Sequence, residues 1–163
     1  RPLAIGGGQE RKRRAGTENL PGIVGFGVAA SIMASKKKLM NKVAAIRDDL
    51  ESRVLSSTSN TQIYGREAAR LPNTSCVSMP GVPADEQVAA MDLKGFMISA
   101  GSACSSGKVE PSHVLMAMGA SKLEAADAIR VSLGWNTTVS DIKEFFAAWL
   151  ELYDKNRRRA SAA

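Results

Sequence analysis

Two long segments of the chain carry apolar residues at helical spacing. In the first, from about Val28 to Leu55, charged side chains stand between apolar residues that recur every three or four positions, namely Ile32, Met33, Leu39, Met40, Val43, Ile46 and Leu50. In the second, from about Val139, the same spacing gathers large residues on one face, namely Ile142, Phe145, Phe146, Trp149, Leu150 and Tyr153. Both patterns predict amphipathic helices, each with one face packed against a core.

Between these two helices the pattern is shorter and changes from segment to segment. The runs TSCVSMPG, FMISAG and AIRVSLG are β-like, whereas ADEQVAAMDLKG and PSHVLMAMG are helix-like and each ends at a glycine. One more short helix is expected just before AIRVSLG. This order of elements predicts an α/β domain with a mainly antiparallel sheet and helices on one face.

The two ends of the chain lack such patterns. Residues 1–27 are rich in glycine and arginine, so we expect loop or strand edge there and no hydrophobic core. The final run NRRRASAA has no apolar periodicity, which predicts a frayed, disordered tail at 156–163. The expected organisation is therefore an N-terminal segment at 1–27, a connecting helix at 28–55, a small domain at 56–155 and the tail.

The composition fits a soluble globular protein. The chain has 163 residues, of which 44% are hydrophobic and 23% charged, and this suits one domain that folds without disulfides. Its two cysteines, Cys76 and Cys104, have neither disulfide-framework nor zinc-site spacing, so we expect a reducing, cytoplasmic location and no metal. No apolar run reaches the roughly 18 residues of a membrane span, and the basic start lacks the apolar core of a secretion signal.

The formal charge of +6 would suit an anionic partner. The charge is divided, however, among RKRR at 11–14, KKK at 36–38 and RRR at 157–159, with few aromatic residues between these runs. A nucleic-acid interface usually joins a continuous basic surface to stacking aromatic side chains. We therefore expect no nucleic-acid partner.

The two cysteines lie in different surroundings. Cys104 stands in SAGSACSSGKVE, where small residues offer no apolar mass to bury it, and such a loop exposes its thiol. Cys76 lies inside the β-like run TSCVSM, which is typical of a buried structural cysteine. A reactive thiol needs a nearby cation or base, and Lys108 is the nearest cation to Cys104 in the sequence. His113 falls in the first turn of the next helix and is interpreted as a surface residue. From the residues alone, a functional and a structural Cys104 remain equally open.

Four segments carry motifs of one enzyme family. GGGQERKRRAGTENLPGIVGFG, LPNTSCVSMPGV, SAGSACSSGKVEPSHVLMAMG and IRVSLGWNTT occur in this order along the chain. Together they resemble the C-terminal part of the pyridoxal-phosphate-dependent cysteine desulfurases of the class V aminotransferase family, in the nitrogen-fixation and iron-sulfur-cluster branch. The resemblance extends from Ile5 to about Trp149. It implies the C-terminal small domain of a fold-type I enzyme, with the end of the large cofactor domain at 1–27 and the long connecting helix at 28–55.

The resemblance gives roles to three residues. Cys104 matches the cysteine, on a long and movable loop in this branch, that takes sulfur from L-cysteine as a protein persulfide and leaves L-alanine. Arg130 in IRVSLG matches the arginine that binds the substrate carboxylate, for which a planar guanidinium is well suited. Thr17 in RAGTEN matches a residue that reaches the cofactor phosphate of the partner subunit in a homodimer. The implied protein partner is a sulfur acceptor or iron-sulfur scaffold protein.

One part of the family pattern has no match. The family holds pyridoxal 5'-phosphate through a lysine in an SxHK-type motif, stacks it under a histidine and pairs its pyridine nitrogen with an aspartate. The sequence has no such motif, and its one histidine is His113. We therefore expect the C-terminal part of a larger enzyme, inactive alone because the cofactor lysine is absent. The alternative is a stand-alone binding or persulfide-relay module that uses Cys104.

Overall fold

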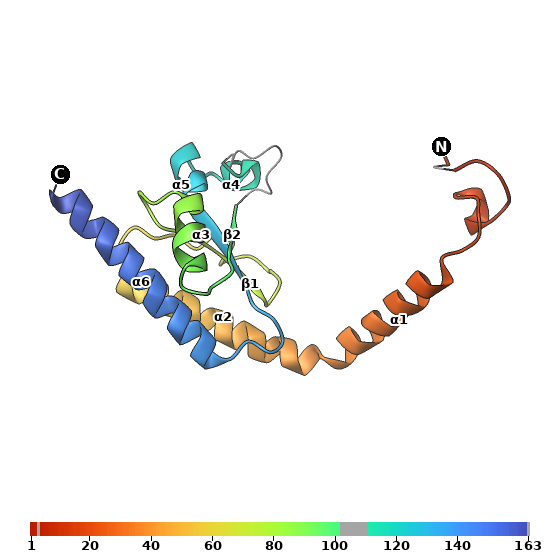
Figure 1. Ribbon diagram of the computed structural model, residues 1–163, viewed down its shortest axis with the longest axis horizontal. Helices are drawn as coiled ribbons and strands as arrows, with labels where there is room; N and C mark the ends of the chain where they lie inside the picture. Colours follow the sequence, from red (N-terminus) through yellow and green to blue (C-terminus); the bar gives the residue numbers. More distant parts are fainter. Residues whose placement is uncertain (3, 102–110, 163) are drawn as a thin grey trace. The chain divides into compact units, whose positions relative to one another are not determined.

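The computed structural model describes residues 1–2, 4–101 and 111–162 (Figure 1). The chain divides into two compact units, Arg1–Lys38 and Leu39–Ala163. Among the described residues, no helix combines the length and the apolar run needed to cross a membrane.

The first unit contains the short 3-10 turn η1 (Glu10–Lys12) and the helix α1 (Leu20–Ser35). Helix α1 begins at Asn19, whose Oδ1 accepts a hydrogen bond from the Gly22 N–H at 3.2 Å, and a proline follows in the first turn. The helix buries none of its residues within the chain, and large apolar side chains such as Phe26 are exposed. Residues 1–27 were expected to be loop or strand edge, and that prediction is wrong from Leu20 onward.

The single helix predicted over 28–55 is two helices, because α1 stops at Ser35 and α2 spans Lys37–Ser57. The Ser35 hydroxyl donates to the Ile32 carbonyl at 2.7 Å, and the Lys36 N–H bonds to the Met33 carbonyl at 3.1 Å. Both bonds take carbonyls away from the regular helical ladder, which ends the helix. The apolar pattern continues across this break, so periodicity alone did not reveal it.

The second unit is built on a three-stranded antiparallel sheet in the order β1-β3-β2. The strands are β1 (Thr74–Ser78), β2 (Ser99–Ala100) and β3 (Ala128–Ser132). The register places Cys76 opposite Arg130 on one side of β3 and Ser99 opposite Arg130 on the other. Arg130 therefore lies on the central strand, with a neighbour on each flanking strand.

Four further helices complete this unit: α3 (Ala84–Asp92), α4 (His113–Ala117), α5 (Lys122–Ala126) and α6 (Val139–Ala162). Gly95 follows α3 with φ of 83° and Gly119 follows α4 with φ of 96°, which is the left-handed conformation that suits glycine. Helices α4 and α5 lie at the end of the unit away from α2 (Figure 1). The predicted α/β class with a mainly antiparallel sheet is confirmed.

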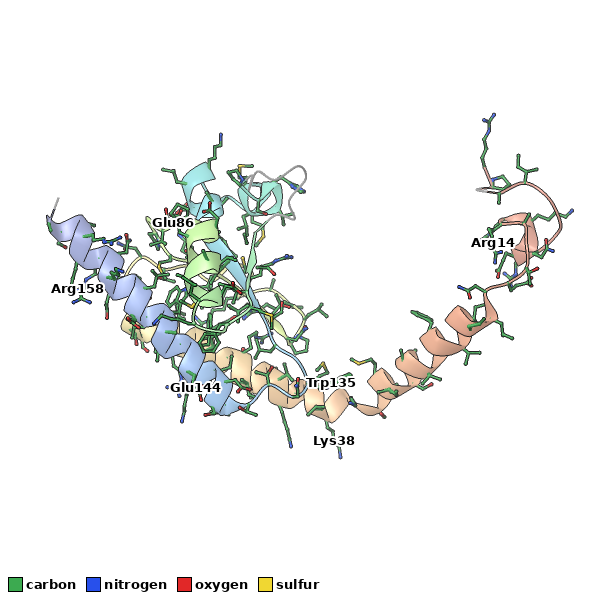
Figure 2. The ribbon with its side chains drawn as sticks, in the orientation of Figure 1. Arg14, Lys38, Glu86, Trp135, Glu144 and Arg158 are labelled. Carbon is green, nitrogen blue, oxygen red and sulfur yellow. The ribbon has the colours of Figure 1, made fainter. Side chains whose placement is uncertain are left out.

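The main core lies between the sheet and the helices α2, α3 and α6. Its buried members come from all of these elements and include Leu50, Met91, Ile129, Phe145 and Trp149. Helix α6 contributes the face expected from its periodicity, while Glu144 and Arg158 lie on its exposed side (Figure 2). The hydrophobic residues of α6 are thus arranged as predicted.

The C-terminal residues continue α6 instead of forming a disordered tail. The helix runs to Ala162, and Asn156 Nδ2 donates to the Pro80 carbonyl at 3.5 Å. Arginine and alanine are good helix formers, and Arg159 in the last turn is favourable beside the partial negative charge of the helix end. A segment without apolar periodicity can therefore extend a helix that is already nucleated by packing.

Candidate functional site

A cavity of about 430 Å³ lies on the face of the sheet opposite the main core, between β1, β3 and α4. Its polar lining comes from Tyr64, Arg70, Thr74, Cys76, Ser112 and Arg130, and the remainder from Gly65, Leu71, Gly101, Val114, Leu115 and Met118. The strand residues among them, Thr74, Cys76 and Arg130, meet because the antiparallel pairing of β1 with β3 brings them to one face of the sheet. We call this space the Arg130 cavity.

Arg130 is the cation that the sheet presents to this cavity. Its side chain is exposed, and within the described part of the chain it forms no hydrogen bond or ion pair. The residues on either side of it in β3, Ile129 and Val131, are buried in the main core. Strand alternation therefore sends Arg130 to the face opposite the core, with its guanidinium available to an anion.

Arg70 lines the same cavity but is already neutralised. Its two terminal nitrogens contact the carboxylate oxygens of Glu51 at 2.6 and 2.5 Å, and the Ser75 hydroxyl donates to the same carboxylate at 2.7 Å. Glu51 is only 2% exposed and the Arg70 side chain 18% exposed. The hydrogen bond to Glu51 is the main cause that raises the pKa of Arg70. Arg70 thus links the cavity wall to α2, and Arg130 is the lining arginine for which the described residues provide no hydrogen-bond or ion-pair partner.

Cys76 faces the cavity next to Arg130 and is half-buried. Burial raises the pKa of its thiol, and the positive charge of Arg130 opposes that rise. The thiol packs against Leu115, Ala125 and Ala128. The sequence predicted a buried structural cysteine but gave no sign that its strand face would border the candidate site.

Two described residues that flank the Cys104 segment, Gly101 and Ser112, line this cavity. Cys104 itself lies outside the described residues, as does the expectation of a movable loop. Gly101 lines the cavity, and a β-carbon placed on it would lie 3.4 Å from Ser112 Cβ and 3.5 Å from the Ala128 carbonyl oxygen. The chain therefore leaves the sheet at Gly101 and returns at Ser112, next to the same point. His113 is exposed at the start of α4, which confirms its interpretation as a surface residue.

Thr17 belongs to the first unit and is exposed. It follows a turn that Arg14 holds together, because one guanidinium nitrogen donates to the carbonyls of Ala15, Gly16 and Thr17 at 3.3, 3.0 and 2.9 Å. Figure 2 shows Arg14 at this turn. Just before it, Glu10, Arg11 and Lys12 all have positive φ. Arg14 thus shapes the segment that carries Thr17.

The Arg130 cavity does not fit a pyridoxal phosphate site on its own. Such a site needs an amine for the cofactor aldehyde and a partner for the pyridine nitrogen. The described lining residues include no lysine and no carboxylate. Within the described residues there is likewise no cluster of side chains suited to a metal ion. The cavity is chemically suited to a small anion such as a carboxylate.

The family model for aminotransferase class-V matches residues 5–145. The cysteine desulfurase of Gluconacetobacter diazotrophicus is 44% identical over 143 residues, which are 87% of this chain and 36% of that protein. Cysteine desulfurase 2 of Trichormus variabilis is 41% identical over 142 residues, with the same 87% and 36% covered. The chain thus spans little more than a third of the length of these relatives.

Two solved structures have a similar fold. The NifS-like protein from Rickettsia africae matches with a TM-score of 0.80 and 36% identity, over 94% of this chain and 40% of that one. The protein SspA, solved in complex with cysteine, matches with a TM-score of 0.52 and 32% identity, over 81% of this chain and 35% of that one. The resemblance expected from the four motifs is confirmed, and this chain belongs to the aminotransferase class-V family.

Proposed function

We propose that the chain acts as part of a pyridoxal-phosphate-dependent cysteine desulfurase. In this proposal it supplies the site for the substrate carboxylate and the thiol that accepts sulfur. Residues 1–27 would end the large cofactor domain, 28–55 would connect the domains, and 56–155 would form the small domain. The observation that carries the proposal is Arg130, an arginine without a described partner that lines a cavity on the central strand.

Arg130 would hold the carboxylate of L-cysteine through two parallel N–H···O bonds. The planar guanidinium fits both carboxylate oxygens, and the half-enclosed cavity strengthens this charge-assisted contact. Cys76 is opposite Arg130 and its neutral thiol adds no competing negative charge. The Glu51 carboxylate is engaged by Arg70, so it does not compete for Arg130.

Cys104 would take the sulfur. It follows Gly101 by three residues, and three extended residues span about 10 Å, so the covalent chain allows Cys104 to reach the cavity that Gly101 lines. The overall reaction converts L-cysteine and the Cys104 thiol into L-alanine and a Cys104 persulfide. The carbon-sulfur bond of the substrate breaks and a sulfur-sulfur bond to Cys104 forms, with the atoms balanced and no external oxidant. Pyridoxal phosphate would supply the electron sink for this cleavage, since the described lining residues of the Arg130 cavity include no group of that chemistry.

The remaining parts of the proposal follow from the family. Thr17, in the turn held by Arg14, would contact the cofactor phosphate of a partner subunit in a homodimer. A sulfur-acceptor or iron-sulfur scaffold protein would then receive the persulfide sulfur. A reducing, cytoplasmic location suits a free sulfur-accepting thiol.

A chimaeric enzyme tests the proposal. The matching C-terminal part of the Gluconacetobacter diazotrophicus cysteine desulfurase is replaced by this chain, and L-alanine release and persulfide on Cys104 are measured. We expect activity, which Cys104→Ser should abolish and Arg130→Lys should weaken by about 1 to 3 kcal/mol in kcat/KM, because lysine keeps the charge and loses the fork. Arg66→Lys, outside the Arg130 cavity, is the matched control and should leave kcat/KM unchanged. Full activity of the Arg130→Lys or Cys104→Ser enzyme would contradict the assignments.

The persulfide-relay module is the second candidate, since the described cavity offers no amine for the cofactor. The desulfurase and relay proposals are distinguished by adding pyridoxal phosphate to the isolated chain and recording the absorbance of the cofactor. A cofactor band that survives gel filtration would indicate a complete cofactor site. Loss of the cofactor, together with an active chimaera, would support the desulfurase proposal over the relay.

A further inference from the structure

Ser112 is a buried hydroxyl in the wall of the Arg130 cavity. Ser112 is only 6% exposed and lines the cavity. Its Oγ accepts a long hydrogen bond from the Leu115 N–H at 3.4 Å. A serine hydroxyl can accept and donate at the same time, and the Ser112 O–H has no acceptor among the described residues. The described structure thus places in the cavity a hydroxyl whose donor capacity is not used by any described residue, and Arg130 lines the same cavity.

Ser112 lies close to the strand that carries Arg130. Gly101 is adjacent to both Ser112 and Ala128, since a β-carbon at Gly101 would be 3.4 Å from Ser112 Cβ and 3.5 Å from the Ala128 carbonyl oxygen. Ala128 precedes Arg130 by two residues on β3, a separation of about 7 Å along a strand. An extended arginine side chain covers a similar length, so both groups can reach one small anion.

We propose that the Ser112 hydroxyl donates a second hydrogen bond to the carboxylate that Arg130 binds. The inference rests on the proposed function and adds a binding residue to it. A carboxylate has about four lone-pair sites, and a guanidinium fork occupies two of them, so a half-enclosed carboxylate needs further donors. The Leu115 N–H bond to Oγ polarises the hydroxyl and strengthens its donation.

The hydroxyl of Tyr64, which also lines the cavity, is less suited to donate a hydrogen bond to the carboxylate. Its oxygen is buried and without a hydrogen-bond partner in the described structure. Burial is the main cause that raises the pKa of Tyr64, and the negative charges of Glu124 and Asp127 add to this rise. The negative charges of these two carboxylates make the surroundings of the Tyr64 hydroxyl less favourable for a bound anion.

The experiment titrates the isolated chain with L-alanine, the carboxylate product of the proposed reaction, and follows the arginine Nε–Hε signals by NMR. The Arg130 signal is identified by its loss in Arg130→Lys, and L-alaninamide, which lacks the carboxylate, serves as the control ligand. We expect Ser112→Ala to raise the Kd for L-alanine roughly tenfold and Ser112→Thr to leave it close to that of the unmodified chain. Ser112→Asp should abolish binding, since it keeps an acceptor for the Leu115 N–H but brings a negative charge into the cavity.

Ser121→Ala is the matched control. Ser121 also precedes a five-residue helix, its Oγ accepts from the Glu124 N–H at 3.3 Å, and it lies outside the cavity lining. Its replacement removes the same kind of capping hydroxyl and should leave the Kd for L-alanine unchanged, with circular dichroism checking the fold of each variant.

Equal Kd values for Ser112→Ala and the unmodified chain, with weaker binding in Arg130→Lys, would overturn the role of Ser112 alone. No response of the Arg130 signal to L-alanine, or the same response to L-alaninamide, would overturn both this role and the proposed carboxylate site.

Discussion

The indole Nε1–H of Trp149 donates to the side-chain Oε1 of Gln87 at 3.2 Å, in the interior between α6 and α3. The Gln87 amide nitrogen donates in turn to the carbonyls of Val82 at 2.8 Å and Asp127 at 2.7 Å. Asp127 directly precedes β3. The fully buried Gln87 side chain therefore joins α3 and α6 to the start of the strand that carries Arg130.

Gln87→Leu should therefore destabilise the protein by about 2–4 kcal/mol, because it leaves the buried Trp149 N–H without its acceptor and removes one hydrogen-bond donor from each of the carbonyls of Val82 and Asp127. The measurement is the free energy of unfolding from urea titration. Gln62→Leu, at an exposed glutamine, should change that free energy by less than about 0.5 kcal/mol. Similar effects of the two substitutions would show that the hydrogen bonds of Gln87 are unimportant.

The buried Glu51 carboxylate gives a second prediction. Glu51→Gln removes the negative charge that compensates Arg70, so it should lower the free energy of unfolding by about 3 kcal/mol. Asp49→Asn breaks the much more exposed pair with Arg53 and is the control, with an expected change below about 0.5 kcal/mol. A Glu51→Gln protein as stable as the control would contradict a buried, charged pair.

The reactivity of Cys76 should depend on Arg130. Since the Arg130 charge lowers the pKa of the Cys76 thiol against the rise caused by burial, Arg130→Gln should raise that pKa further. In a Cys104→Ser background, the pH profile of iodoacetamide alkylation at Cys76 should then move to higher pH. Arg158→Gln, an exposed change on α6, should leave the profile in place. A profile unaffected by Arg130→Gln would mean that the two side chains do not interact.

Asp127 predicts a pH dependence of stability. Burial raises the pKa of its carboxyl above the ordinary 3.8, and the hydrogen bond from the Gly81 N–H opposes this. The folded protein thus binds the proton of the Asp127 carboxyl more tightly than the unfolded chain does. The protonated carboxyl therefore contributes stability at low pH, and this contribution is lost as the pH rises through the pKa of the folded state. Asp127→Asn cannot titrate, so its melting temperature relative to the unmodified chain should be higher at pH 7 than at pH 4. The opposite trend would contradict the raised pKa.

Much of the second unit could be predicted from the sequence, because its elements have strong local signals. The apolar stripe of α6, the β-like run around Cys76 and the glycines that end α3 and α4 each depend on a few adjacent residues. The break at Lys36 escaped this reasoning, since it arises from hydrogen bonds of Ser35 and Lys36 and leaves the apolar spacing intact.

The candidate site was only partly predictable. Arg130 was identified through a family motif, whereas its strand register with Cys76 depends on pairing between residues 54 positions apart, which no local pattern specifies. The pairing of Glu51 with Arg70 was missed for a similar reason. On a helix with many charged residues, a glutamate that becomes buried looks the same in sequence as one that faces water.

The closeness of Gly101 and Ser112 has a consequence for how this protein can vary. Because the two ends of the intervening segment already meet at the sheet, a longer or shorter segment would not need to move either β2 or α4. The entropic cost of closing a flexible loop grows slowly with length, by about 0.6 kcal/mol for each doubling. The number of residues between Gly101 and Ser112 can therefore vary at little entropic cost, while the Arg130 cavity keeps its form.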